Sequence, residues 1–161
     1  MIRLLKYIAF TIVLMGSGIS YGQDCTNYHV ENCRWADRSY LYSRQSRSAV
    51  FTPGMTSEFQ MVVYGGEEYY ISVGAHRKLG DIRLRIFDDK EKKSLLYDNA
   101  KYNYEEYFYF KNTQTRDLIV EITTKEPDNN NETGERYCLG VLVEFKNIRD
   151  SQELKEDSVG F

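Results

Sequence analysis

The sequence predicts an all-β protein: an antiparallel two-sheet β-sandwich, jelly-roll-like, of about eight strands with one short N-terminal helix. Three observations predict it. After Ser48, apolar and polar residues alternate over most of the chain, which is the period of a half-buried strand. Turn signals such as Gly65-Gly66 separate these segments at short intervals. The segments are rich in β-branched and aromatic residues, and the 161-residue chain contains 14 tyrosines.

The alternation places the expected strands at 49–51, 59–64, 69–74, 82–87, 95–97, 107–110, 117–123 and 136–146. In the segment 107–110, Phe108 and Phe110 are expected to face the core, with Tyr107 and Tyr109 facing out or lying at the rim. Two packed antiparallel sheets would bury the apolar face of each strand against the other sheet.

A helix is expected over about 29–44. Apolar residues recur there at helical spacing, with charged residues available for the wet side. The residues that carry this spacing are Val30, Cys33, Ala36, Tyr40 and Leu41. The helix is expected to cover an open end or an edge of the sandwich, where it would hide unpaired backbone groups.

The first residues resemble a secretory signal peptide. Arg3 and Lys6 precede an uncharged run at 7–15, and small residues follow up to Gly22. We therefore expect a signal peptide over 1–22, a secreted or periplasmic protein, a single β-sandwich domain over 23–147 and a polar C-terminal tail over 148–161. The alternatives are a retained N-terminal anchor, a buried first strand, or acylation at Cys25.

The charge of the chain argues against nucleic acid as a partner and gives no reason to expect adsorption to anionic lipid. The formal net charge is −3, and removal of two cations with residues 1–22 leaves 19 Lys and Arg against 24 Asp and Glu, a net charge of −5. Phosphate backbones and anionic lipid surfaces attract basic proteins, so we expect no nucleic acid as a partner. No second stretch reaches membrane length, so no transmembrane segment is expected after signal cleavage.

Three cysteines remain after processing: Cys25, Cys33 and Cys138. Disulfides persist outside the cytoplasm, and an odd number leaves one thiol free or paired with another chain. We expect a bridge to Cys138, with Cys33 as its partner and Cys25 as the open alternative. His29 and Cys33 are interpreted as a surface histidine beside a partly buried cysteine, since a zinc site needs further ligands.

Several segments resemble the bacterial pre-peptidase C-terminal domain and secreted β-sandwich proteins of the Bacteroidetes. The matching pieces are Phe59, then GGEEYYISV at 65–73, GDIRLRIFD at 80–88, LYDN at 96–99 and LIVEI at 118–122. The resemblance covers 48–145 and implies a sandwich that binds or solubilises without catalysing, in some cases with calcium. This chain departs from that pattern in its N-terminal cysteine-bearing helix and in lacking a preceding protease domain.

Two kinds of site are predicted from the residues. Asp81 and Asp98 lie at expected strand ends, where oxygen ligands would suit a calcium ion, although aspartate is equally common in turns. A ligand-binding face is expected on the clustered tyrosines, whose flat rings suit a sugar or a peptide. These tyrosines are Tyr97, Tyr102, Tyr104, Tyr107 and Tyr109.

Motifs for catalysis are missing from the sequence. Beyond the expected signal peptide it contains no G-x-S-x-G elbow, P-loop or H-E-x-x-H sequence, and its two histidines stand in no recognisable constellation. We therefore expect a non-enzyme without a cofactor, apart from the calcium site. The function predicted is a binding module for a glycan or a peptide; the alternative is a structural or assembly protein of the cell envelope acting through a protein partner.

Overall fold

The computed structural model describes residues 24–88, 92, 94–127 and 134–148. The expected signal peptide and nearly all of the expected C-terminal tail lie outside the described residues.

Nine strands within the described residues form two antiparallel sheets, which confirms the expected two-sheet β-sandwich. The first sheet has the order β1-β9-β4-β7, and β2 pairs with the same edge of β9 as β1 does. The second sheet has the order β3-β8-β5-β6. The strands of the first sheet are β1 (Leu41–Tyr42), β2 (Arg47–Phe51), β4 (Glu67–Ala75), β7 (Tyr107–Asn112) and β9 (Tyr137–Asn147). Those of the second are β3 (Thr56–Val63), β5 (Arg83–Phe87), β6 (Leu95–Asp98) and β8 (Arg116–Thr123).

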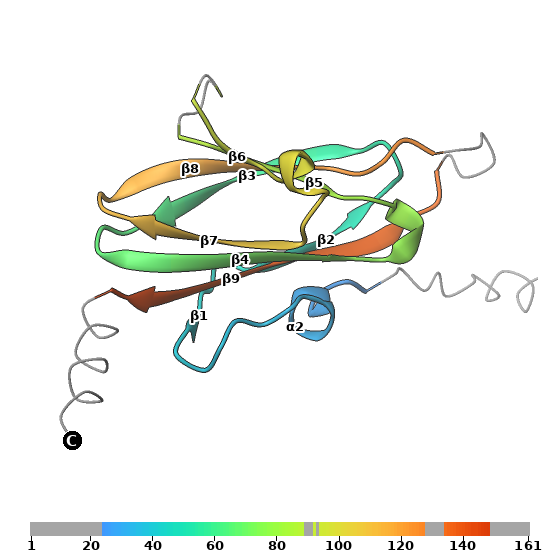
Figure 1. The fold of residues 1–161 in the computed structure, drawn as a ribbon. Helices are drawn as coiled ribbons and strands as arrows, with labels where there is room; N and C mark the ends of the chain where they lie inside the picture. Colours follow the sequence, from blue (N-terminus) through green and yellow to red (C-terminus); the bar gives the residue numbers. More distant parts are fainter. Residues whose placement is uncertain (1–23, 89–91, 93, 128–133, 149–161) are drawn as a thin grey trace, which may run out of the picture.

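The core lies between the two sheets, which Figure 1 shows as two layers. Every second residue of a strand points inward, so period-two alternation in the sequence becomes one buried face per strand. On β9, Leu139, Val141 and Val143 are inside. On β7, Phe108 and Phe110 pack against the core while Tyr109 is exposed, as expected from the sequence.

The expected helix at 29–44 is wrong beyond its first turn. The helix α2 spans only Tyr28–Asn32, and the chain then runs in irregular structure into β1. The helical spacing of apolar residues predicted that they would share one buried face. They do not, because Val30 and Leu41 are exposed.

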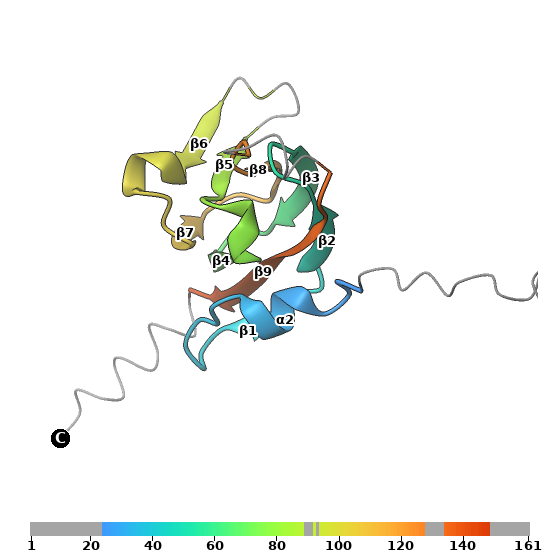
Figure 2. The same cartoon turned by 90° about the vertical axis from the view of Figure 1, so that its right-hand side faces the viewer.

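α2 covers the outer face of the first sheet, not an edge or an open end of the sandwich (Figures 1 and 2). Gly74 and Gly140 are paired neighbours on β4 and β9, and their missing side chains make room for the helix backbone. A Cβ on Gly74 would lie 2.3 Å from the carbonyl oxygen of Asn32, and one on Gly140 would lie 2.5 Å from the Cα of His29. The helix therefore sits where the sheet carries no side chains.

The disulfide joins Cys25 to Cys138, so the expected bridge to Cys138 is present but the expected partner, Cys33, is wrong. The reason is geometric. Cys25 precedes α2 and reaches Cys138 near the start of β9, whereas Cys33 follows α2 and its backbone lies against Gly74. Burial raises the pKa of the Cys33 thiol to about 12, so this thiol is not ionised near neutral pH.

Polar side chains on the same outer face hold the segment that follows α2. Glu144 accepts a hydrogen bond from the backbone N–H of Ala36 at 2.7 Å, and Ser72 donates one to the carbonyl of Arg34 at 2.6 Å. Glu144 and Ser72 are both buried, so these bonds satisfy groups that would otherwise be costly to remove from water. The N-terminal segment is therefore part of the folded domain.

Candidate binding site at the free edge of β7

The two sheets meet along two open sides, one between β2 and β3 and the other between β6 and β7 (Figure 2). A pocket opens on each side. The pocket between β6 and β7 has a volume of about 360 Å³, against about 210 Å³ for the one between β2 and β3. We call the larger one the β6/β7 cleft. Its lining residues are Ile86, Leu96, Tyr97, Tyr102, Phe108, Tyr109, Phe110, Lys111, Arg116 and Leu118.

A column of nearly parallel aromatic rings leads from the surface into this cleft. The ring of Tyr102 lies 5.7 Å from that of Tyr97 at an interplanar angle of 8°, and Tyr97 lies 4.0 Å from Phe108 at 11°. The column continues through Phe110 to the fully buried Tyr69. Its outer end is open, because 58% of the Tyr102 surface is exposed. The cleft thus offers an apolar ligand a stacked aromatic wall.

Tyr97 carries a buried polar atom in this wall. Its hydroxyl oxygen is buried and has no hydrogen-bond partner among the described residues. Burial, with a smaller contribution from the charge of Glu105, raises the pKa of Tyr97 to about 12. The hydroxyl is therefore neutral at physiological pH, and its missing hydrogen bond costs stability in the present structure.

The charged residues that line the β6/β7 cleft are all positive. They are Lys111 and Arg116. Arg116 donates to Asp88 at 2.7 Å and to the side-chain oxygen of Asn112 at 3.1 Å. Lys111 is exposed and has no ion pair within the described part of the chain. Lys111 alternates with the core-facing Phe110, so it lies on the outer-face side of β7 and is available to a ligand that runs along the strand edge.

The backbone of β7 borders the cleft with an unpaired edge. β7 is the last strand of its sheet and pairs only with β4 in the described structure. The N–H of Val73 donates to the carbonyl of Glu106 at 2.8 Å, and antiparallel bonds alternate along a strand. By this alternation the N–H and C=O groups of Tyr107, Tyr109 and Lys111 point to the free edge.

The loop that carries Tyr102 is firmly held. The side chain of the buried Asn99 accepts a bond from the N–H of Leu84 at 2.8 Å and donates to the carbonyls of Ile82 and Glu105 at 2.8 and 3.2 Å. These bonds tie η2 (Asn99–Tyr102) to the strands around it. A ligand would meet a preformed aromatic surface here, which lowers the entropy cost of binding.

The predicted tyrosine face is brought together only in part. Tyr97, Tyr102 and Tyr109 line the β6/β7 cleft. Tyr104 instead lines a separate pocket of about 210 Å³. The rings of Tyr107 and Tyr109 both lie on the outer face of the first sheet, 6.1 Å apart, with the Arg34 guanidinium 4.3 Å from the Tyr107 ring centre and the Tyr40 ring 5.9 Å from that of Tyr109. Sequence reasoning missed the part played by Lys111 and by the backbone edge. A run of aromatic residues with no proline was the available signal.

The structure places the two predicted calcium ligands in different surroundings. Asp98 forms an ion pair with Arg83 at 2.7 Å and accepts a bond from the N–H of Ala100 at 3.1 Å. The bond from Arg83 holds the pKa of Asp98 below its usual value. Asp81 lines the pocket of Tyr104. The described residues contain no group of three His, Cys, Asp or Glu side chains suited to a metal ion, and the calcium site stays a prediction.

A serine and a histidine also meet, in a place that opens on no described pocket. The ring nitrogens of His29 lie 2.7 Å from the Ser48 hydroxyl and 3.0 Å from the Tyr42 hydroxyl. The Ser48 hydroxyl also accepts the backbone N–H of His29 at 2.8 Å. His29 was expected at the surface but is buried. Because both bonds of Ser48 go to one residue, this cluster anchors α2 to β2.

A scan against protein-family models finds no match for this chain, and a search of curated proteins finds none, so the resemblance to the pre-peptidase C-terminal domain stays a prediction. Among solved structures, the chain is similar to Aeromonas hydrophila PliG, a periplasmic lysozyme inhibitor of g-type lysozyme. The TM-score is 0.46 at 10% identity, over 70% of this chain and 92% of that one. The described residues include no helix with the length and hydrophobicity to cross a membrane.

Proposed function

We propose that this protein is an extracytoplasmic, non-catalytic binding module that takes an extended segment of polypeptide at the free edge of β7. The observation that carries the proposal is the unpaired backbone of β7 beside the β6/β7 cleft. An added strand would bond to the backbone of Tyr107, Tyr109 and Lys111, while alternate side chains enter the cleft. Backbone bonds supply affinity in this mode of recognition and pockets supply specificity.

The disulfide supports a location outside the cytoplasm. Cys25 and Cys138 are bonded across 113 residues of sequence, and such bonds persist in oxidising compartments. The expected signal peptide leads to the same location.

The lining of the cleft favours binding over catalysis. Its titratable residues are Tyr97, Tyr102, Tyr109, Lys111 and Arg116. General acid–base chemistry near neutral pH depends on groups such as histidine or a perturbed carboxylate, and the lining contains neither. The cations favour a segment that carries an acidic residue beside its apolar ones.

A glycan is a second candidate, favoured by the ring of Tyr102. This ring is largely exposed and backed by Tyr97, an arrangement on which a sugar ring can stack. The glycan would use the mouth of the cleft and leave the backbone edge of β7 unpaired.

The test measures binding of fluorescent decapeptides by anisotropy, with a polysaccharide panel as a second arm. The peptides alternate aromatic and polar residues and end in either two glutamates or two lysines. We expect the glutamate series to bind more tightly. The variant Leu96→Glu should weaken binding at least about tenfold, because an acid then stands in the cleft next to an acidic ligand.

Leu95→Glu is the matched control, since Leu95 is equally exposed but does not line the cleft. Failure of every peptide to bind, or equal effects of the two leucine variants, would contradict the peptide proposal. Binding of polysaccharide alone would support the glycan candidate in its place.

A further inference from the structure

We infer that the extended segment is supplied by a second copy of this chain, whose β7 pairs antiparallel with β7 about a two-fold axis through Tyr109. This inference rests on the proposed function and names its partner. It follows from the symmetry of the edge, from the charges at the ends of β7 and from the state of the other strand edges.

The edge of β7 matches itself in register. Its edge-directed residues are Tyr107, Tyr109 and Lys111, spaced evenly about Tyr109. Pairing Tyr109 with Tyr109 of the second copy aligns Tyr107 with Lys111. Each aligned pair then exchanges two backbone hydrogen bonds, so every edge-directed group within 107–111 gains a partner. A two-fold contact of this kind uses one surface on both copies and closes on itself.

The charges around β7 favour the antiparallel direction. The strand follows the exposed Glu105 and Glu106 and carries the exposed Lys111 near its end. In this register Lys111 lies opposite Tyr107 of the second copy, and the acidic residues Glu105 and Glu106 come directly before that tyrosine. An antiparallel neighbour therefore brings Lys111 towards the acidic end of β7 in the second copy. A parallel neighbour in register would place like charges side by side, which is unfavourable across strands.

The aromatic residues of β7 would complete the cleft. In this register Phe108 aligns with Phe110 of the second copy, and both point to the inner side of the sheet. The second copy therefore brings an apolar ring towards Leu96 and Tyr102 at the mouth of the β6/β7 cleft. Leu96 and Tyr102 are 45% and 58% exposed, so the contact would remove apolar surface from water.

The other described edges are less suited to such a contact. β3 is longer than β7, but the side-chain amide of Gln45 already forms hydrogen bonds with the N–H and C=O of Val62 on the outer edge of β3. β1, β6 and β2 have two, four and five residues, fewer than the six of β7. β7 has neither a proline nor a bulge, and Lys111 is its one charged side chain, so it has few of the devices with which natural proteins protect an edge.

Sedimentation velocity over a range of concentrations tests the inference on disulfide-bonded protein recovered from the periplasm of a bacterial host. We expect a reversible monomer–dimer equilibrium. Lys111→Glu and Glu105→Lys should each weaken the dimer about tenfold, because each variant brings like charges together and the two-fold axis produces that repulsion at two places in the dimer. The double variant should restore the dissociation constant to within about twofold of wild type. Arg44→Glu, at an exposed site outside β7, controls for net charge.

The outcomes separate this inference from the proposed function. If the protein is a monomer at every concentration but still binds the glutamate peptides, the inference of a second copy is overturned and the proposed function stands. Monomer without peptide binding would overturn both. A dimer that neither charge reversal weakens, or that the double variant does not restore, would overturn the β7 pairing. Recovery by the double variant supports it, because a merely structural role for either residue would not be rescued by exchanging their charges.

Discussion

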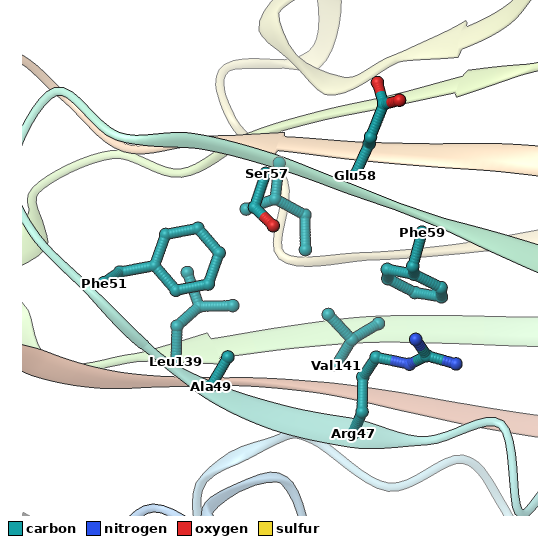
Figure 3. Close-up of a pocket in the computed structure, with 9 residues that line it drawn as sticks. Arg47, Ala49, Phe51, Ser57, Glu58, Phe59, Leu139 and Val141 are labelled. Carbon is teal, nitrogen blue, oxygen red and sulfur yellow. The ribbon is translucent and has the colours of Figure 1, made fainter.

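The two open sides of the sandwich have the same origin, an edge strand from each sheet, yet the chain closes one and leaves the other open. Between β2 and β3, the Gln45 side chain accepts from the N–H of Val62 at 2.7 Å and donates to its carbonyl at 2.8 Å, as a neighbouring strand would. Arg47 lies over Phe59, 4.1 Å from the ring centre, at the mouth of the smaller pocket (Figure 3). On β7, the Arg34 guanidinium lies over the Tyr107 ring, but no described side chain bonds to the outward-directed backbone groups of Tyr107, Tyr109 and Lys111.

This difference indicates that edge protection in the protein is selective. A free strand edge is a liability in a secreted protein, because it can recruit other chains. The N-terminal segment covers the outer face of the first sheet, and the residues that follow it place Gln45 against β3. The edge of β7 carries the exposed Tyr109 among partly buried aromatic residues instead, and aromatic residues are enriched in contact surfaces.

The largest effect should come from releasing the N-terminal segment that closes the β2/β3 side. Replacing Cys25 and Cys138 by alanine should lower the free energy of unfolding by about 4 kcal/mol, because the bridge closes a long loop in the unfolded chain. Chemical denaturation measures this change. Cys33→Ala is the control, and we expect a much smaller loss there; equal losses would show that the bridge does not act as described.

Removing the amide of Gln45 should make the closed side resemble the open one. Gln45→Ala leaves the N–H and C=O of Val62 without their partner and should cost about 1 kcal/mol. It should also produce a new association at high concentration, seen by light scattering, because the edge of β3 is then free. Gln60→Ala changes an exposed neighbour on the same edge and should do neither.

Protonation of His29 should loosen the same closed side by a smaller amount. Burial lowers the pKa of His29 below its ordinary value of 6.5, so the unfolded chain takes up a proton more readily than the folded one. Stability is therefore full above about pH 6.5 and falls as the pH drops below that value towards the lowered folded pKa. Thermal melts between about pH 8 and 5, a range that spans the ordinary pKa of histidine, should show this loss in the wild type.

The variant His29→Gln should reduce that dependence, since glutamine does not titrate. A wild-type melting temperature that rises on acidification through this range would contradict the burial of a neutral histidine against Ser48.

The smallest effect is expected within the open side. Tyr97→Phe removes a buried hydroxyl that has no partner among the described residues, so stability should stay unchanged or rise by up to about 1 kcal/mol. Tyr69→Phe is the control, because the Tyr69 hydroxyl accepts the N–H of Tyr64 at 2.8 Å and its loss should destabilise. A clear destabilisation in Tyr97→Phe would mean that its hydroxyl is satisfied.

The strands were predictable from the sequence because their signal is local. Alternation at Leu139, Val141 and Val143 sets which side chains are buried, whatever the neighbouring strand. The helix at 29–44 and the bridge at Cys33 were wrong because both depend on distant residues. The flat surface made by Gly74 and Gly140 determines where α2 lies, and no window of the N-terminal sequence contains it.

The candidate site was predictable in its residue type but not in its location. The tyrosines were recognised as a possible face, and Tyr97, Tyr102 and Tyr109 do line one cleft. Which strand ends a sheet is set by long-range pairing, so the free edge beside Tyr109 could not be read from the segment itself. The same holds for the contact of Gln45 with Val62, which are 17 residues apart.

Amide hydrogen exchange, resolved residue by residue, tests most directly whether the free edge of β7 is the binding surface. In dilute protein the amide of Tyr109 should exchange rapidly, while that of Val62, bonded to Gln45, should exchange slowly. Adding the glutamate peptide, or raising the protein concentration, should slow exchange at Tyr109 and leave the exposed edge residue Gln60 fast. Slow exchange at Tyr109 in dilute protein, or protection that appears at Gln60 and not at Tyr109, would contradict the account.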